Sequence, residues 1–168
     1  MYFMQIKNPQ NISRIMPFRK IIAVDALSLT LFVIDRILKS TLQKDPFAYK
    51  DFFDSGILKI QRYENTGVAF SIPLPQWLIL SLSTTIVLAL AWFLMRALQK
   101  KQSLAVLFYD LIIVGALSNI IDRLLYGHVI DYINFIFYFW IFNIADIMIT
   151  VGIAGILFLH LRETKKPR

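Results

Sequence analysis

Residues 76–95, QWLILSLSTTIVLALAWFLM, decide the fold, because they run for twenty positions without a charged side chain. At about 1.5 Å per residue, a helix of this length crosses the roughly 30 Å hydrocarbon core of a bilayer. The whole chain has the same character, with 57% hydrophobic and 17% charged residues. A soluble domain is nearer half apolar and a quarter charged. The sequence therefore predicts an integral membrane protein.

Three further apolar runs approach or exceed the length of a span, at 21–40, 104–122 and about 138–160. Each must be helical, because lipid offers no partner for unpaired backbone N–H and C=O groups. We expect an all-α membrane protein with four transmembrane helices in a single domain over 1–168.

Two segments between the spans should lie outside the membrane. Segment 41–75 balances its charges, and its part 57–72 is more typical of a strand than of a helix, so we expect a small extracytoplasmic subdomain there. Clustered aromatic residues in Tyr132–Trp140 are typical of the headgroup level, and they predict a short interfacial helix or loop that leads into the fourth span.

The basic residues orient the protein. The net charge is +7. Three clusters at 1–20, 96–103 and 161–168 carry net +4, +3 and +3, and the rest of the chain carries net −3. With four spans, all three clusters lie on one side, as the positive-inside rule requires of the cytoplasm. Both termini are therefore expected in the cytoplasm. This placement of the charge also argues against a nucleic-acid partner.

Ionisable side chains in or beside a span are candidate functional residues, because their burial costs several kcal/mol. Asp146 lies just inside the outer end of the fourth span, and Asn143 is three residues earlier on the same helical face. Asp131 follows a turn at Gly127, beyond the third span. Consecutive spans are antiparallel neighbours, so the two aspartates can meet. The alternatives are a structural Asp146 satisfied by a neighbouring helix and a solvated loop Asp131.

Two carboxylates in a partly dry site cannot both ionise at low cost, so they share a proton. The ionised member can then act as a general base on water while the protonated member polarises a carbonyl. This pairing predicts peptide-bond hydrolysis by Asp131 and Asp146.

Other polar residues have weaker assignments. Asn119 and Asp122 repeat the Asn-x-x-Asp spacing, and Arg123 follows them; they either support the aspartate pair or form an interfacial ion pair. Asp35 and Lys39, four residues apart, are more consistent with a structural ion pair. No metal or other cofactor is expected, because the chain has no Cys and only two His, His128 and His160. A serine hydrolase is not supported either, because the Ser residues have no His or Lys placed to activate them.

Five motifs in a fixed order complete the sequence evidence: IDRILK (34–39), NTGVAF (65–70), GALSNIIDR (115–123), GHVIDY (127–132) and FNIADIMITVG (142–152). Together they closely resemble the lipoprotein signal peptidases, the type II signal peptidases of bacteria, over about residues 20–162. The resemblance implies four transmembrane helices, a small extracytoplasmic β-rich cradle, a periplasmic helix above the site, and an inner-membrane location.

The resemblance also implies the activity and its residues. It matches Asp131 and Asp146 to two catalytic carboxylates near the outer leaflet, acting on a diacylglyceryl prolipoprotein that is cleaved on the amino side of its lipobox cysteine. We expect an otherwise monomeric protein surrounded by membrane lipids. Positions of support or substrate contact are implied for Asn65, Gly67, Asn119, Asp122, Arg123, Asn143 and Ala145, with Asp35 and Lys39 in the first span.

Within these motifs the chain departs from the family's usual pattern at three other positions. Arg36 replaces the usual Gln, which puts in doubt a hydrogen bond from the first span; Leu38 stands where Ser or Thr is common, and Ser118 replaces the usual Gly. Two other classes of function remain open from the residues alone. A proton- or ion-conducting protein would distribute carboxylates along the bilayer path, and a structural subunit would leave Asp131 and Asp146 replaceable.

Overall fold

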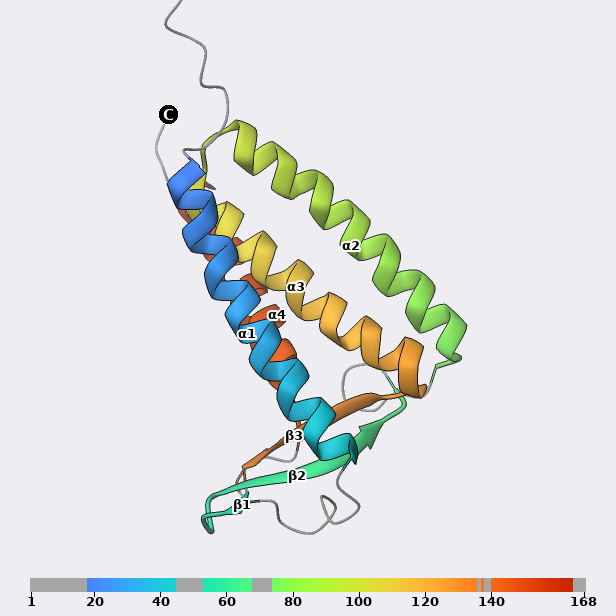
Figure 1. Cartoon of the computed structure of the whole chain (residues 1–168). Coiled ribbons are helices and arrows are strands. Elements are labelled where there is room, and N and C mark those ends of the chain that lie inside the picture. Colours follow the sequence, from blue (N-terminus) through green and yellow to red (C-terminus); the bar gives the residue numbers. More distant parts are fainter. Residues whose placement is uncertain (1–17, 45–52, 68–73, 136, 138–139, 165–168) are drawn as a thin grey trace, which may run out of the picture.

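The computed structural model describes residues 18–44, 53–67, 74–135, 137 and 140–164. In chain order the elements are α1 (Phe18–Lys44), β1 (Phe53–Asp54), β2 (Leu58–Asn65), α2 (Gln76–Gln99), α3 (Ser103–Tyr126), β3 (Val129–Phe135) and α4 (Ile144–Thr164). The helices run side by side, and the strands form a small sheet across one end of them (Figure 1).

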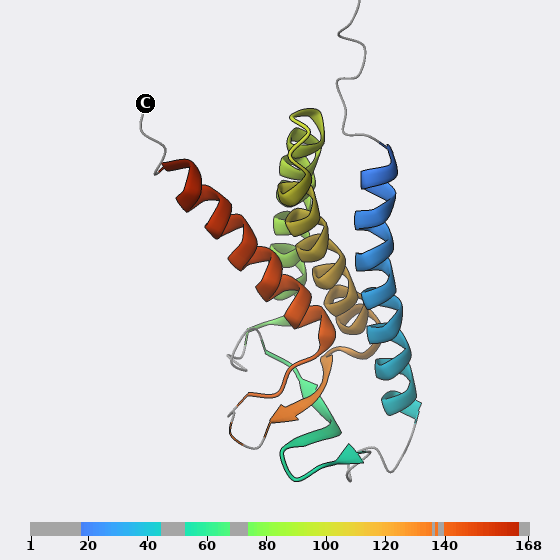
Figure 2. The ribbon, with the colours of Figure 1, turned by 90° about the vertical axis from the view of Figure 1, so that its left-hand side faces the viewer.

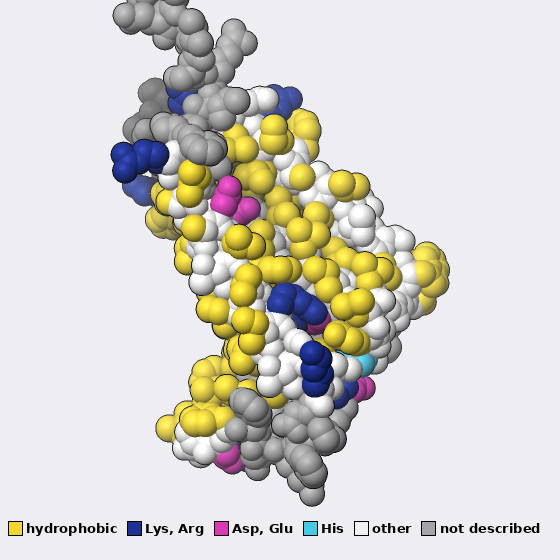
Figure 3. All heavy atoms as spheres, in the orientation of Figure 1, with side chains coloured by type: hydrophobic (Ala, Val, Ile, Leu, Met, Phe, Trp, Pro, Cys, Tyr) yellow, Lys and Arg dark blue, Asp and Glu magenta, His cyan; other side chains and the backbone are white. Residues whose placement is uncertain are grey.

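Three of the described helices, α2, α3 and α4, are long and apolar enough to cross a membrane by length and composition. α1 is not among them, because it carries Asp25, Asp35, Arg36 and Lys39 within 27 residues. The described surface supports a lipid environment. Many large hydrophobic side chains are exposed along the helices, and hydrophobic atoms cover most of the face in Figure 3 between its two ends.

The sheet is antiparallel in the order β1-β2-β3. β2 confirms the strand expected within 57–72, as far as Asn65; residues 68–72 lie outside the described part of the chain. Its register with β3 pairs Tyr63 with Asp131 and Asn65 with Val129. The sheet is therefore not a contiguous 41–75 unit, because β3 comes from beyond α3 and 41–44 belong to α1.

The interfacial helix or loop expected at Tyr132–Trp140 is wrong for its first residues, which belong to β3. β2 offers these residues an edge to pair with, and a bridge from Ile133 to Phe142 then brings the chain back along β3. Among the described residues of 129–143 no helix is present, and α4 begins at Ile144, later than the predicted 138. The periplasmic helix that the resemblance implies likewise has no counterpart within the described segments 53–67 and 129–135.

α3 and α4 approach closely where each carries glycine. A Cβ added at Gly115 would lie 2.6 Å from the carbonyl oxygen of Ala145, and one at Gly152 would lie 2.7 Å from the carbonyl oxygen of Phe108. α3 ends at Gly127, whose φ of 82° is the left-handed conformation that favours glycine after a helix. These two features bring α3, β3 and the start of α4 together.

The two ends of the molecule differ. The described start of α1, the turn between α2 and α3, and the end of α4 lie at one end, and the sheet lies at the other (Figures 1 and 2).

Candidate active site

Asp131 lies on β3 and is 3% exposed. Its two carboxylate oxygens accept hydrogen bonds from β2 and from the residue that precedes α4. The Asn65 side-chain amide donates to Oδ2 at 2.9 Å, and the Asn143 side-chain amide donates to Oδ1 at 2.7 Å. Both donors are neutral, so they orient the carboxylate without adding a counter-charge.

Asp146 is fixed by the way α4 begins. Asn143 caps the helix: its side-chain oxygen accepts from the Asp146 N–H at 2.9 Å, and the Asp146 carboxylate accepts from the Asn143 N–H at 3.2 Å. This reciprocal pair is a capping box, in which each residue satisfies a backbone donor of the other. Asn143 therefore contacts both aspartates, through its amide to Asp131 and through the cap to Asp146.

Asn119 of α3 supplies the remaining contact to Asp146. Its amide nitrogen donates to Asp146 Oδ1 at 2.8 Å, and its oxygen accepts from Lys39 Nζ at 2.9 Å and from Asn143 at 3.2 Å. A lysine can only donate, so it holds the oxygen of the amide toward itself and turns the NH₂ group toward Asp146.

Behind these residues lies a buried ionic cluster, which we define as Asp35, Arg36, Lys39 and Asp122. Lys39 Nζ lies 3.0 Å from Asp35 and 2.8 Å from Asp122, and these three side chains are fully buried. Arg36 pairs with the second oxygen of Asp122 and donates to the Ser118 carbonyl at 3.3 Å. Arg36 therefore connects the first helix to α3 through these two contacts.

Asp35, the member of the cluster on the other side of Lys39, contacts β3 and the start of α4. Asp35 accepts from the Tyr132 hydroxyl at 2.8 Å, from the Ser118 hydroxyl at 2.6 Å and from the Ala145 N–H at 3.4 Å. The Tyr132 oxygen in turn accepts from the Ile144 N–H at 3.2 Å. These contacts fix the first turn of α4 against α1.

Arg123 lies at the end of α3 and reaches the turn that follows β2. It donates to the Gly67 carbonyl at 3.0 Å, and the Gly67 N–H donates to the Asn65 side chain at 3.1 Å. The turn expected from Asn-Thr-Gly is therefore present as a side-chain-closed turn, and it positions Asn65 for Asp131. The end of the NTGVAF motif, from Val68, lies outside the described residues.

Asp131 titrates near neutrality. Burial raises its pKa to about 7, the nearby Asp146 charge adds to the increase, and the hydrogen bonds from Asn65 and Asn143 oppose it. Burial and the Asp35 carboxylate also raise the pKa of Tyr132, which keeps its hydroxyl protonated as a donor. A carboxyl group with a pKa near 7 can exchange a proton at physiological pH, as a general acid or base requires.

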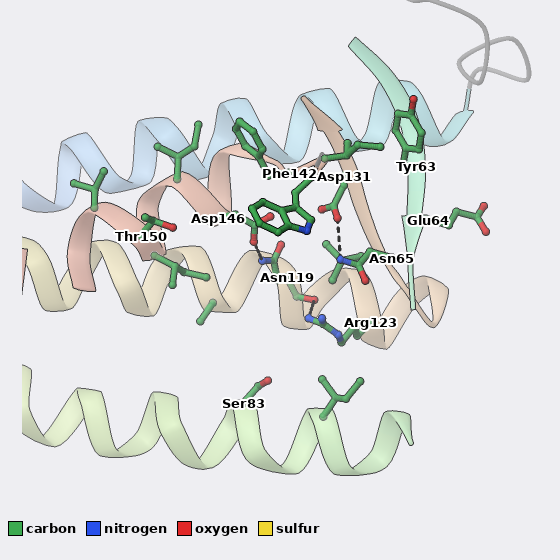
Figure 4. Close-up of a pocket in the computed structure, with 18 of the residues that line it drawn as sticks. Tyr63, Glu64, Asn65, Ser83, Asn119, Arg123, Asp131, Phe142, Asp146 and Thr150 are labelled. Atoms are coloured by element: carbon green, nitrogen blue, oxygen red, sulfur yellow. Dashed lines mark hydrogen bonds between the residues drawn. The ribbon is translucent and has the colours of Figure 1, made fainter. Parts of the chain in front are cut away.

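A cavity of about 1330 Å³ opens beside the two aspartates. Figure 4 shows Asp131 and Asp146 with Asn65, Asn119 and Arg123 at its polar end, and Ser83 of α2 on the opposite wall. The rest of its lining is mostly apolar and comes from α2, α3, α4 and the chain before α4; it includes Ile79, Ile86, Phe135, Trp140, Ile147 and Val151. Such a site can bind an apolar chain next to paired carboxylates.

The structure brings every predicted site residue into one connected region. The ion pair of Asp35 and Lys39 is confirmed, whereas the alternative pair of Asp122 with Arg123 is wrong, because Asp122 instead pairs with Arg36 and Lys39. Sequence reasoning missed Tyr132, which it placed among interfacial aromatics. Tyr132 is buried in a cluster with Leu42 of α1, against which Leu38 and Ile144 also pack, and no local pattern indicates such contacts between distant elements.

One described aspartate in a span lies apart from the site. Asp110 accepts a hydrogen bond from Ser28 near the other end of the helices. Among the described residues, no group of three or more His, Asp and Glu side chains could hold a metal ion.

Comparison with known proteins points to one family. A family model described as signal peptidase II matches residues 27–162. The lipoprotein signal peptidase of Sinorhizobium fredii is 43% identical over 117 residues, which cover 67% of this chain and 70% of that protein. The lipoprotein signal peptidase of Allorhizobium ampelinum is 38% identical over 145 residues, which cover 83% and 88%.

The fold is also similar to solved structures. One structure of a bacterial membrane enzyme superposes with a TM-score of 0.78 at 26% identity and covers 92% of this chain and 96% of that one. A second, also of a bacterial membrane enzyme, has a TM-score of 0.73 at 27% identity.

Proposed function

The chain belongs to the signal peptidase II family, and from that premise we propose that it is an aspartic endopeptidase of the membrane in which Asp131 and Asp146 carry the reaction. It removes signal peptides from prolipoproteins. The observation that carries the catalytic assignment is the pair itself: two carboxylates at the polar end of one cavity, each held by neutral amides and bridged by Asn143.

The two carboxylates have different surroundings, which divides their roles. Asp146 is the third residue of α4, where the helix dipole and the Asn143 N–H favour a negative charge. Asp131 lies on a strand, and its pKa of about 7 favours the protonated form. We assign Asp146 as the general base and Asp131 as the general acid.

Peptide hydrolysis then proceeds without a covalent intermediate. Asp146 takes a proton from a water molecule as the water oxygen attacks the scissile carbonyl carbon. Asp131 gives its proton to the carbonyl oxygen, which forms a tetrahedral diol. Collapse of the diol breaks the C–N bond, the proton held by Asp146 passes to the leaving amine, and a diol hydroxyl returns its proton to Asp131.

The substrate follows from the mostly apolar cavity. A segment that carries a diacylglyceryl cysteine fits it, because acyl chains can occupy the space between α2 and α4 while the scissile bond stays beside Asp131 and Asp146. Cleavage on the amino side of that cysteine would then leave the lipid on the mature protein.

The membrane orientation follows from charge. The helix ends opposite the sheet carry five basic residues, Arg19, Arg96, Lys100, Lys101 and Arg162. This charge supports a cytoplasmic location for that end in the bacterial inner membrane. The sheet and the carboxylate pair then face the outer leaflet. α1 serves as a fourth span in this arrangement, because Asp35, Arg36 and Lys39 are paired within the protein.

Replacement of either carboxylate by its neutral isostere tests the proposal. In Asp131→Asn and Asp146→Asn, cleavage of a diacylglyceryl prolipoprotein should fall by about 10²–10⁴-fold or more, as expected for loss of a general acid or base. The assay is the gel shift of the substrate in detergent or bilayers. Asp54→Asn, on the exposed edge strand, is the matched control and should cleave normally. Normal cleavage by either of the first two variants overturns the assignment.

A further inference from the structure

Arg36 is the one member of the buried ionic cluster that reaches the surface, with 19% of its side chain exposed. It is not among the residues that line the cavity. Its guanidinium nevertheless ends on Asp122, deep between α1 and α3, and also donates to the Ser118 carbonyl. A long cationic side chain directed inward in this way has a role other than covering the surface, and two features of its surroundings indicate that role.

The first reason is charge. The three protons of the Lys39 ammonium face three acceptors, on Asp35, Asp122 and Asn119. Two carboxylates against one ammonium would leave a fully buried group with a net charge of −1. Arg36 supplies the second positive charge and makes the cluster neutral, which matters because an uncompensated charge is costly in a dry interior.

The second reason is geometry, because Asp122 connects to both carboxylates of the proposed pair. Its Oδ2 accepts from the N–H of Ile130, the residue directly before Asp131, at 3.3 Å. The same oxygen accepts from Lys39, which holds the Asn119 oxygen, and Asn119 donates to Asp146. Two series of hydrogen bonds, which we call the two branches, therefore start at Asp122. One branch ends beside Asp131 and the other ends on Asp146, and Arg36 pairs with the aspartate from which both start.

We infer that Arg36 is a positioning residue for the cleavage reaction: by pairing with Asp122 it neutralises the ionic cluster and fixes the two branches that set the relative placement of Asp131 and Asp146. The inference rests on the proposed catalytic role of that pair. The competing role for Arg36 is simple packing of α1 on α3.

The two roles separate in kinetics. Arg36→Gln removes the charge and keeps a hydrogen-bonding side chain, and the readouts are kcat, KM and the pH profile on a diacylglyceryl prolipoprotein. We expect kcat to fall about 10–100-fold, as for loss of an outer residue that orients an active group. KM should stay unchanged, because Arg36 does not line the cavity. The alkaline limb of the profile, where the general acid Asp131 loses its proton, should move to higher pH, because the uncompensated charge of Asp122 raises the pKa of Asp131.

Two further variants test the cause. Arg36→Lys restores the charge and should recover most of kcat. Asp122→Asn in the Arg36→Gln background makes the cluster neutral again, and the alkaline limb should return toward that of the wild type. Asp146, Lys39, Arg123 and Glu64, the other charged groups around Asp131 and its cavity, are unaltered in these proteins. Arg96→Gln, which removes an equal charge at the far end of α2, is the matched control and should be unaffected.

The result that overturns the inference is an Arg36→Gln enzyme with a lower melting temperature but wild-type kcat and pH profile. A raised KM with unchanged kcat would also overturn it, since that pattern indicates a substrate contact. Neither result bears on the catalytic pair. That assignment fails only when Asp131→Asn or Asp146→Asn cleaves normally, so the two failures are distinguishable.

Discussion

Two pairs of aspartates belong to one connected network of side chains, and they are stabilised in opposite ways. Asp35 and Asp122 are fully buried and share the ammonium of Lys39, with Arg36 on the outer oxygen of Asp122. Asp131 and Asp146 face a cavity and are held by the neutral amides of Asn65, Asn119 and Asn143. A neighbouring cation supplies an opposite charge to a carboxylate, whereas a neutral amide orients a carboxylate without supplying one.

The comparison explains why only one pair is suited to chemistry. Cations would keep both members of a pair ionised, and a general acid would then be missing. Amides give orientation without that bias, and the cavity gives access to water and substrate. The cation-matched pair instead anchors β3 and the first turn of α4, through Tyr132, Ala145 and Ile130.

Removal of the shared cation should produce the largest effect on stability. Lys39→Met leaves two buried carboxylates with only Arg36 between them, and loss of one partner from a buried ion pair costs about 3–5 kcal/mol. We expect a strongly lowered melting temperature, followed by intrinsic fluorescence in detergent. The double variant Lys39→Met with Asp35→Asn should be less destabilised than Lys39→Met alone. A Lys39→Met protein that melts like the wild type would show that the two pairs do not differ in this way.

The amide that joins the two catalytic candidates comes next. Asn143→Ala removes the donor to Asp131 and opens the capping box of Asp146, so both carboxylates lose a fixed orientation. Misplacement of reacting groups by about 1 Å costs on the order of 10²-fold in rate, whereas loss of a helix cap costs only about 1 kcal/mol of stability. We expect kcat for prolipoprotein cleavage to fall about 10²-fold with a modest change in melting temperature.

Ser118→Ala provides the matched control for that variant, because it removes one hydrogen bond to Asp35 from the cation-held pair. It should lower stability slightly and leave kcat near the wild-type value. Equal losses of kcat in the two variants would mean that neutral amides and cations serve the same purpose in the two pairs.

Much of this arrangement was predictable from the sequence, and the remainder has a physical reason. The apolar run 76–95 indicates a helix because no charged residue interrupts it, and the Asn143–Asp146 spacing indicates a shared face because both residues lie in one turn of helix. Local patterns of this kind are visible in a single sequence. The strand within 57–72 also followed from its local character.

Long-range pairing was not predictable in the same way. β3 forms because β2 offers an edge to residues more than sixty positions later, and this pairing sets Tyr63 opposite Asp131. Tyr132 of β3 is then buried with Leu42 of α1. Arg36 illustrates the same limit: the sequence marks it as a departure, but only the packing of α1 on α3 joins it to Asp122. Side chains matched across distant elements leave no spacing to detect.

The pH dependence of stability distinguishes the two pairs most finely. The pKa of Asp131 is about 7 in the folded protein against about 3.9 in an unfolded chain, so the folded form holds a proton that the unfolded form has lost. This contribution is fully present below about pH 4 and is lost as the pH rises through 7. At 1.36 kcal/mol per pH unit, the wild type should lose about 2.6 kcal/mol between pH 5 and 8 that Asp131→Asn keeps. Melting temperatures of both proteins across this range test the sign of this difference in stability. The variant should equal the wild type near pH 5 and exceed it at pH 8, because the amide of the variant is never forced to ionise in a buried site. A difference of the opposite sign would mean that folding stabilises Asp131 as a carboxylate, and the contrast between the amide-held and cation-held pairs would then fail at its central residue.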